Sequence, residues 1–414
     1  TGPKRRSASA TCASIHGRDC TRGRADVWAR GHRGGASSQI FHLRSREERE
    51  GGTPSHATPR GEGPRDILRT SDATAGNRRR QILPAATRAA IRPPRMPSLR
   101  TSNVARLDRG TYDVLVLGEA LWDVYPLRAG QSIRSRRREQ RCLGGAPANV
   151  AVTLARLGLN VGMIGALGDD PLGEGLRDEL TAAGVDAKHI VSVRARTGVT
   201  WVELRAGVPR YLPFRSPSAD MLLHPKAIPE HLAASWIHVG SSSFARPESA
   251  EATRLAITRS NAFLSVDLNV YPHLWPRDGR IVDHLSDVLA AARIVKASES
   301  DLAALGLSED ELHALRPDAL TIVTLAERGA IARIGDRRIE HRPRPVRVVD
   351  PIGAGDAFMA GVLAVIARHG WDEARALVFG ARLGARAVSA LGATTALVDL
   401  GRERRSLARR PSVR

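Results

Sequence analysis

The chain has 414 residues, of which 42% are hydrophobic, so it can bury one large core or two smaller ones. Its formal net charge is +20, but residues 1–100 hold 21 Lys/Arg against 8 Asp/Glu and residues 401–414 hold 6 against 1, which leaves residues 101–400 at +2. This nearly neutral middle excludes a nucleic-acid-binding domain that works through bulk charge, and 3 cysteines without a CxxC pair exclude a disulfide framework.

The two ends of the chain differ in composition from the middle. Residues 1–105 are rich in Arg, Gly, Ser, Pro and Thr without sustained periodicity, which predicts a disordered basic extension. It can be interpreted as an arm for nucleic acid or anionic lipid, as a transit peptide, or as a spurious extension ahead of Met96; its acids argue against the transit peptide. Residues 401–414 are expected to be a basic tail. With no membrane-spanning run and no secretory signal in the sequence, we expect a cytoplasmic protein.

From Asp113 onward, β-branched runs alternate with helix-like segments, which predicts one domain over residues 106–400. The expected strands are Val114–Leu117, Val161–Ala166, Val199–Leu204, Trp236–Val239, Phe263–Val266, Arg293–Lys296, Thr321–Thr324 and Val346–Val349. The expected helices are Ala148–Leu157, Leu172–Ala183, Glu248–Thr258, Ile281–Ala290, Asp356–Arg368 and Asp372–Ala390. The alternation predicts an α/β fold, a doubly wound and mainly parallel sheet with helices on both faces.

One region departs from this alternation. Residues Thr197–Arg215 form two extended runs joined at Ala206-Gly207, which predicts a hairpin rather than a crossover. Together with residues 125–143, this hairpin would form a small β lid. Ligands of doubly wound sheets bind beyond the carboxyl ends of the strands, so the lid is expected to cover a site there.

The stretch "RVVDPIGAGDAFMAG", residues 347–361, places two glycines and an acid between an expected strand and a helix. A dinucleotide fingerprint fails, because Phe358 stands at the third glycine and an acid would repel the pyrophosphate. A turn that binds nothing is a second interpretation. In the third, phosphoryl transfer, the amides of Gly353, Ala354 and Gly355 hold the phosphoryl and Asp356 accepts a proton from the attacking hydroxyl. No P-loop motif, GxxxxGK[ST], occurs in the sequence.

A second glycine cluster decides between these interpretations. It reads "GGAPANVAVTLARLG", residues 144–158, and with "DPIGAGDAFMAG", residues 350–361, it resembles the two motifs of the ribokinase-like (pfkB-type) carbohydrate kinases. The resemblance runs from about Tyr112 to Val398. Within that family the segments "GEALWDV", "GALGDDPLGEGL", "RTGVTWVEL", "FRSPSADMLL", "DLNVYPHLWP" and "VKASESDL" stand in the order that fructokinases show.

The resemblance implies roles for residues at the acceptor end of the site. Asp356 matches the catalytic base, and Gly353, Ala354 and Gly355 match the anion hole. Asp123 matches an acid that accepts hydrogen bonds from sugar hydroxyls, which suits a neutral polyol. The remaining matches to the sugar site are Gly144, Gly145, Asn149 and Arg215.

Other positions match the nucleotide end. Lys296, Ser298 and Asp301 correspond to a segment that supports phosphates and Mg²⁺, with Asp301 acting through water. The strand ending at Thr324 and the turn to Gly329 match the nucleotide side. Gly392 and Ala393 match a loop bordering the nucleotide, and Asp350 matches a carboxylate near the monovalent cation, K⁺, of relatives that use one.

Three positions depart from the family pattern. Pro351 replaces a threonine, and Ala326 replaces a glycine of the nucleotide-side turn. Tyr271 stands where relatives carry an arginine near the transferred phosphates. Without that cation, transition-state stabilisation would weaken unless Arg277 or Lys296 compensates.

The sequence therefore predicts an ATP- and Mg²⁺-dependent kinase that phosphorylates a terminal hydroxyl of a sugar, with fructose as the first candidate. A 2-keto-3-deoxygluconate kinase is the alternative within the family. A catalytically weak pseudokinase that serves as a binding or regulatory module is the alternative from another class. The expected partners are the sugar and ATP, with no membrane, with nucleic acid only through the basic extension, and with a homodimer left open.

Overall fold

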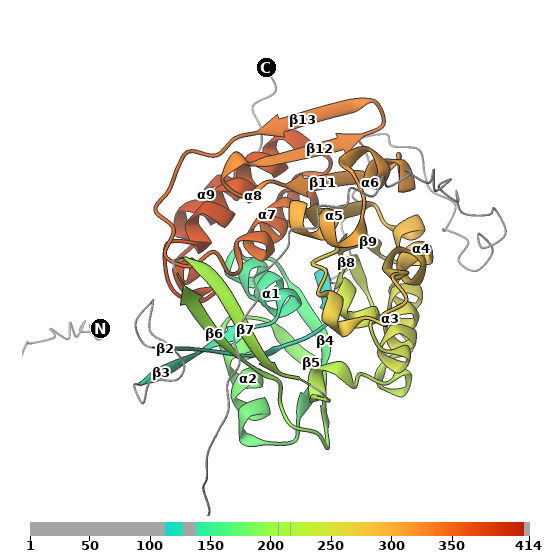
Figure 1. Ribbon diagram of the computed structural model, residues 1–414, viewed down its shortest axis with the longest axis vertical. Helices are drawn as coiled ribbons and strands as arrows, with labels where there is room; N and C mark the ends of the chain where they lie inside the picture. Colours follow the sequence, from blue (N-terminus) through green and yellow to red (C-terminus); the bar gives the residue numbers. More distant parts are fainter. Residues whose placement is uncertain (1–111, 127–137, 206, 216, 410–414) are drawn as a thin grey trace, which may run out of the picture. The chain divides into compact units, whose positions relative to one another are not determined.

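The computed structural model describes residues 112–126, 138–205, 207–215 and 217–409 (Figure 1). The predicted basic extension, residues 1–105, lies outside the described residues, as do residues 127–137 of the expected lid. Within the described part of the chain, no helix is long and apolar enough to cross a membrane.

The main sheet has nine strands, and its order is β13-β12-β11-β10-β9-β8-β1-β4-β5. The pairs from β11 through β5 are parallel, whereas β12 and β13 are antiparallel. This confirms the predicted doubly wound, mainly parallel sheet. The strands are β1 (Tyr112–Leu117), β4 (Val161–Gly168), β5 (Asp186–Val193), β8 (Ala234–Gly240), β9 (Phe263–Asp267), β10 (Ile294–Ser298), β11 (Leu320–Thr324), β12 (Ala330–Ile334) and β13 (Arg337–His341).

Helices cover both faces of this sheet, and each face has its own core. Successive side chains of a strand point to opposite faces, so Val114 and Val116 of β1 pack into one core and Leu115 and Leu117 into the other. The first core includes residues of α1 (Ala146–Arg156), α2 (Pro171–Ala182), α7 (Ala354–His369), α8 (Glu373–Ala387) and α9 (Gly401–Ala408). The second includes residues of α3 (Pro247–Ser260), α4 (Ile281–Ala291), α5 (Glu299–Leu305) and α6 (Glu309–Leu315).

A second, four-stranded sheet has the order β3-β2-β6-β7. Its strands are β2 (Leu121–Pro126), β3 (Glu139–Gly144), β6 (Val199–Arg205) and β7 (Val208–Phe214). The antiparallel pair β6–β7 forms the hairpin expected over Thr197–Arg215. Trp122 of β2 is buried, and its Nε1 donates a hydrogen bond to Leu172 O at 2.9 Å, which ties the small sheet to the first turn of α2.

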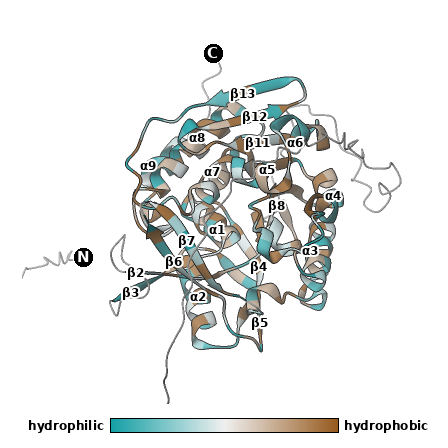
Figure 2. Ribbon diagram, in the orientation of Figure 1, coloured by the Kyte–Doolittle hydropathy of each residue, from teal (hydrophilic) through white to brown (hydrophobic). Residues whose placement is uncertain are grey.

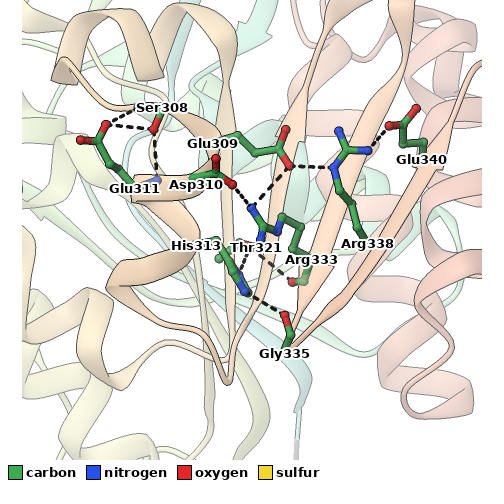
Figure 3. Close-up of polar contacts among 10 residues, drawn as sticks. All are labelled: Ser308, Glu309, Asp310, Glu311, His313, Thr321, Arg333, Gly335, Arg338 and Glu340. Carbon is green, nitrogen blue, oxygen red and sulfur yellow. Dashed lines mark hydrogen bonds and ion pairs between the residues drawn. The ribbon is translucent and has the colours of Figure 1, made fainter.

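Charged residues cover the open edge of the main sheet at β13, which is largely hydrophilic in Figure 2. Arg333 and Arg338 form ion pairs with Glu309 and Asp310 at the start of α6 (Figure 3). In the same close-up, Ser308 and Glu311 form the capping box that begins α6. Charges on an edge strand oppose pairing with another chain, so this edge is protected.

One prediction about secondary structure was wrong. The β-branched run Val346–Val349 is not a strand, because within the described residues it joins no sheet; its β-branched residues favour extended backbone but do not provide a partner strand. Residues 401–408, expected as part of a basic tail, form α9, whose Leu407 lies in the core and whose Glu403 pairs with Arg386. The structure also contains β2, β3, β5, β12, β13, α5 and α6, which sequence periodicity did not predict.

Candidate active site

A cavity of about 900 Å³ lies beyond the carboxyl ends of the parallel strands. Thr200, Tyr211 and Pro213 of the small sheet line it on one side. Of the residues expected at the site, it is lined by Asp123, Gly145, Asn149, Arg215, Lys296, Ser298, Asp301, Thr324, Gly329, Gly353, Ala354, Gly355 and Asp356. Gly144, Asp350, Gly392 and Ala393 are not among the lining residues. They contact lining residues directly or through one another: Gly144 adjoins Asp123, Ala393 adjoins Gly353, and Asp350 bonds to Ile352 N and Gly392 N.

Asp356 belongs to the first turn of α7 and is 9% exposed. Asn149 of α1 donates a hydrogen bond from Nδ2 to its Oδ2 at 2.8 Å. Burial raises the pKa of Asp356 to about 7; the hydrogen bond from Asn149 and the charge of Lys296 lower it, while Asp267 and Glu119 raise it. A carboxyl group with a pKa near neutrality in a cavity can take up and release a proton at neutral pH.

The turn before α7 leaves the first amides of the helix without strong partners among the described residues, since Ala354 N donates only a long hydrogen bond, 3.4 Å, to Pro351 O. Gly353 has φ 79° in the left-handed region, and a Cβ on it would lie 2.4 Å from Ala393 Cβ, so glycine is required there. Behind the turn, Ile352 N donates to Asp350 Oδ1 at 3.0 Å and Gly392 N donates to Asp350 Oδ2 at 2.9 Å. The buried Asp350 therefore holds the loop that positions the start of α7, where amides and helix dipole attract an anion.

Asp123 lies within β2, and it is 7% exposed. Its pKa is raised to about 7 by burial and by the charges of Asp350 and Asp356, against the opposing charge of Arg215. Gly144 of the neighbouring strand gives it room, because a Cβ there would lie 2.3 Å from Asp123 Oδ2. Gly144 therefore permits the observed position of the Asp123 side chain and does not itself line the cavity.

Arg215 lines the cavity, but its guanidinium is engaged. Nε and Nη2 both donate to Asp220 Oδ2, at 3.1 and 2.5 Å. Ser218 Oγ donates to Asp220 Oδ1 at 2.6 Å, so this acid is itself held in place. The positive charge of Arg215 is therefore largely balanced inside the protein.

The sequence analysis did not select several residues that line the cavity, among them Glu119, Tyr211 and Asn269, whereas Tyr271, noted there as a departure from the family pattern, does line it. Glu119 follows β1 and is 4% exposed, and Ser242 Oγ donates to its Oε2 at 2.7 Å. Its position directly after a strand, in "GEALWDV", was a signal that could have found it. Burial raises the pKa of Tyr271 well above its ordinary value, and the charges of Tyr211, Asp356 and Glu119 raise it further, so the phenol stays neutral.

At the other end of the cavity, β10 leads into α5 through a capping box. Asp301 Oδ2 accepts hydrogen bonds from Ser298 N at 2.6 Å and Ser298 Oγ at 2.7 Å, and Asp301 Oδ1 accepts one from Val270 N at 2.7 Å. No group of three or more metal-ligating side chains occurs among the described residues. An ion here would take most of its ligands from water and phosphate, as Mg²⁺ does at nucleotides.

The nucleotide-side turn is strained. Ala326, which replaces a glycine of the family pattern, has φ 52°, a left-handed conformation that costs a non-glycine residue about 1 kcal/mol. Gly329 closes the turn with φ 103°, and a Cβ on it would lie 2.0 Å from His341 O. The extended segment around Val346 and Val348, which are 48% and 55% exposed, continues this wall of the cavity.

A doubly wound sheet, a small sheet beside its carboxyl edge, and a glycine turn with a buried acid define the architecture of a sugar kinase. The family described as pfkB family carbohydrate kinase matches residues 112–400, and the chain belongs to this family. A fructokinase from Klebsiella pneumoniae is 37% identical over 301 residues, which cover 69% of this chain and 95% of the relative. The chain is therefore a sugar kinase.

Solved structures support the same assignment. Aminoimidazole riboside kinase from Salmonella enterica, complexed with aminoimidazole riboside and an ATP analog, is 30% identical with a TM-score of 0.61, over 71% of this chain and 99% of that one. A fructokinase double mutant from Vibrio cholerae, bound to fructose, ADP and potassium ion, is 28% identical with a TM-score of 0.61, over 70% and 96% of the two chains. These neighbours bind a sugar or riboside together with a nucleotide.

Proposed function

We propose that this kinase transfers the γ-phosphoryl group of ATP to a terminal hydroxyl of a neutral sugar, and that the sugar is fructose. The observation that carries the choice of a neutral acceptor is the charge around the acceptor end of the cavity. Glu119, Asp123 and Asp356 contribute carboxyl groups there, and the nearby cation Arg215 is bonded twice to Asp220. The fructokinase relatives favour fructose among neutral sugars.

This charge pattern disfavours 2-keto-3-deoxygluconate. An acidic sugar needs a cation with free donors, because a buried carboxylate without a partner is costly. Breaking the Arg215–Asp220 pair to supply one would leave Asp220, whose residue is 8% exposed, buried without its cation. A neutral polyol has hydroxyl donors instead, and these match the acceptors of Asp123 and Glu119.

In the proposed reaction, Asp356 accepts the proton of the attacking hydroxyl, and Asn149 orients its carboxylate through Nδ2. The amides of Gly353, Ala354 and Gly355 bind the phosphoryl oxygens at the N-terminus of α7. The small sheet excludes water, which limits wasteful hydrolysis of ATP.

Two ions fit the donor sets of the described residues. Asp301, which lines the nucleotide end of the cavity, would hold Mg²⁺ through water, and Mg²⁺ would neutralise phosphate charge when bound. Asp350 has lone pairs beyond those used by Ile352 N and Gly392 N, and the buried Tyr125 Oη lies near it, so a K⁺ ion would find oxygen ligands there.

The test is ADP release by the full chain with fructose, ribose, glucose, aminoimidazole riboside and 2-keto-3-deoxygluconate. We expect the highest kcat/KM with fructose and at least about 100-fold less with the acidic sugar, the penalty of an unpaired buried charge. A higher kcat/KM with 2-keto-3-deoxygluconate or with the riboside would refute the proposed acceptor. Absence of turnover with every sugar would refute the kinase activity and favour a binding module.

A further inference from the structure

We propose that the ammonium group of Lys296 contacts the phosphoryl group in transit, and that Asp267 is its positioning acid. This rests on the proposed phosphoryl transfer and names a further residue for it. Lys296 comes from β10 and Asp267 ends the neighbouring β9, so adjacent parallel strands present both at the carboxyl edge.

The side chain of Lys296 extends from β10 to the N-terminus of α7. It lines the cavity although it is 3% exposed, and its Nζ donates to Asp267 Oδ1 at 2.9 Å and Oδ2 at 2.8 Å. A Cβ built on Gly355 would lie 3.1 Å from Nζ. The second glycine of Gly-Ala-Gly therefore leaves room for the ammonium group beside the first amides of the helix.

This placement brings the positive ammonium group of Lys296 close to the N-terminus of α7. The N-terminus of a helix carries a partial positive charge, so a lysine there opposes the helix dipole. Such an arrangement is stabilised by an anion that contacts both groups. Asp267 balances the charge of Lys296, but among the described residues it accepts no hydrogen bond from the first α7 amides, and a phosphoryl at those amides would meet both positive groups.

The ammonium group has a proton left for this contact. A lysine has three N–H donors, and two of the bonds from Nζ go to Asp267, the one hydrogen-bond partner of Nζ among the described residues. Asp267, Asp301 and Asp356 raise the pKa of Lys296 against the effect of burial, which lowers it, so the group stays charged.

The other cavity-lining cations among the described residues are less suited. Arg215 is bonded to Asp220, and Arg344 is exposed. Tyr271, at the position where the family resemblance implies an arginine, is neutral. Lys296 is therefore the buried cation that faces the α7 amides.

In the step, the acceptor oxygen forms a bond to the γ-phosphorus while the bond to the β–γ bridging oxygen breaks, and ADP leaves with that electron pair. The hydroxyl proton passes to Asp356, and Lys296 keeps all of its protons. Its charge opposes the negative charge spread over the phosphoryl oxygens.

The competing explanation is a buried ion pair that only joins β9 to β10. The double variant Lys296→Met with Asp267→Asn separates the two, because it removes both charges and leaves neither buried alone. We expect kcat to fall by about 100-fold or more, the usual effect of losing one stabilising group, with the KM for sugar within about threefold. A kcat within about fivefold of the parent's would overturn the proposal.

Two further variants test whether the loss of kcat comes from the contact of Lys296 with the phosphoryl group. The control Arg254→Met with Asp287→Asn removes an ion pair of 2.6 Å that does not line the cavity, and its kcat should match the parent's. Gly355→Ala, which suits a helix, should displace Nζ and lower kcat in the parent but have little effect in the Lys296→Met, Asp267→Asn background. An equal effect in both backgrounds would overturn the contact. If the double variant proves unstable, an unchanged kcat for Gly355→Ala in the parent background would overturn it instead.

Binding of ADP with tetrafluoroaluminate, a mimic of the moving phosphoryl, tests Lys296 separately from the acceptor. The Lys296→Met, Asp267→Asn variant should lose affinity for this complex by about the same factor as kcat while binding ADP alone normally. Unchanged affinity would overturn the proposal. If the parent phosphorylates no sugar, the proposed function fails, and this measurement still decides the role of Lys296.

Discussion

Replacing Asp356 with asparagine should make the protein more stable and nearly inactive. The carboxyl group is buried, and its pKa rises from an ordinary 3.8 to about 7. At pH above 7 the folded state must hold a charge that the unfolded chain holds in water. Each tenfold change in proton affinity corresponds to about 1.4 kcal/mol, so the charge costs the folded state up to about 4 kcal/mol.

Asparagine removes this charge and keeps an oxygen that can accept the hydrogen bond from Asn149. A neutral acceptor gives a weaker bond, so we expect a net gain of about 2–4 kcal/mol, or about 4–8 °C in Tm. The gain depends on pH in a defined direction. Below pH 4 both states are protonated and the gain is absent; it grows between pH 4 and 7 as only the unfolded chain loses its proton, and it is constant above 7.

The assays are thermal unfolding of parent and variant at pH 4, 5, 6, 7 and 8, and coupled ADP release at pH 7.5. We expect kcat to fall by at least about 10²-fold, the contribution of a general base, with sugar affinity largely kept. In the parent, kcat/KM should rise with pH up to about 7 as Asp356 loses its proton. The matched control is Asp170→Asn, at the N-cap of α2 and outside the cavity lining.

The control should change stability in the opposite direction. Although partial burial opposes it, hydrogen bonds from Thr197 and Gly173 hold the pKa of Asp170 below its ordinary value. Asp170→Asn should therefore lower Tm at pH 7 by the equivalent of about 1 kcal/mol and leave kcat unchanged, because the amide keeps only one of the two oxygens that accept these hydrogen bonds. If Asp356→Asn lowered Tm, or kept kcat within a few fold of the parent's, the assignment of a buried, destabilising base would be wrong.

Three further predictions concern the surrounding residues. Asp123→Asn should raise the KM for the sugar by about tenfold or more with a smaller change in kcat, in initial-rate measurements; an unchanged KM would remove Asp123 from the sugar site. Gly353→Ala should lower the free energy of unfolding by about 2–5 kcal/mol in denaturant, because backbone strain adds to a contact of 2.4 Å between the new Cβ and Ala393. The control Gly306→Ala, at φ 65° with nothing within 4 Å, should lower it by only about 1–2 kcal/mol, and equal losses would contradict the steric argument. Asp301→Ala and Glu311→Ala each break a capping box, and Asp301→Ala should lower Tm more because it also leaves Val270 N without its partner. Only Asp301→Ala should raise the Mg²⁺ concentration needed for half-maximal turnover.

Secondary structure was predictable where it depended on local patterns. The alternating β-branched runs of β1, β4, β8, β9, β10 and β11 predicted the parallel sheet, because strands buried on both faces form short continuous apolar runs. The polar edge strand β13 was missed because Arg337–His341 contains one aliphatic residue and owes its conformation to pairing with β12. The run Val346–Val349 was predicted as a strand for the opposite reason, since its residues suit a strand but no neighbouring strand among the described residues pairs with it.

The sequence by itself determined the elements of the candidate site whose cause is local. Glycines at 353 and 355 before an apolar helix predicted an anion-binding turn, and Asp356 at its start indicated a proton acceptor rather than a dinucleotide cradle. The family resemblance added the second glycine cluster and the order of the segments. Residues from both motifs do line one cavity.

Only the tertiary structure decided how charges are shared across the site. Asn149 meets Asp356 across 207 residues of sequence, Arg215 is bonded to Asp220 rather than free, and Lys296 lies against Gly355 while Asp267 holds it. Such contacts depend on which strands are neighbours and on burial, which lowers the local dielectric and shifts each pKa. The amino-acid sequence does not directly give the strand neighbours or the burial of a side chain, because both arise when distant segments pack together.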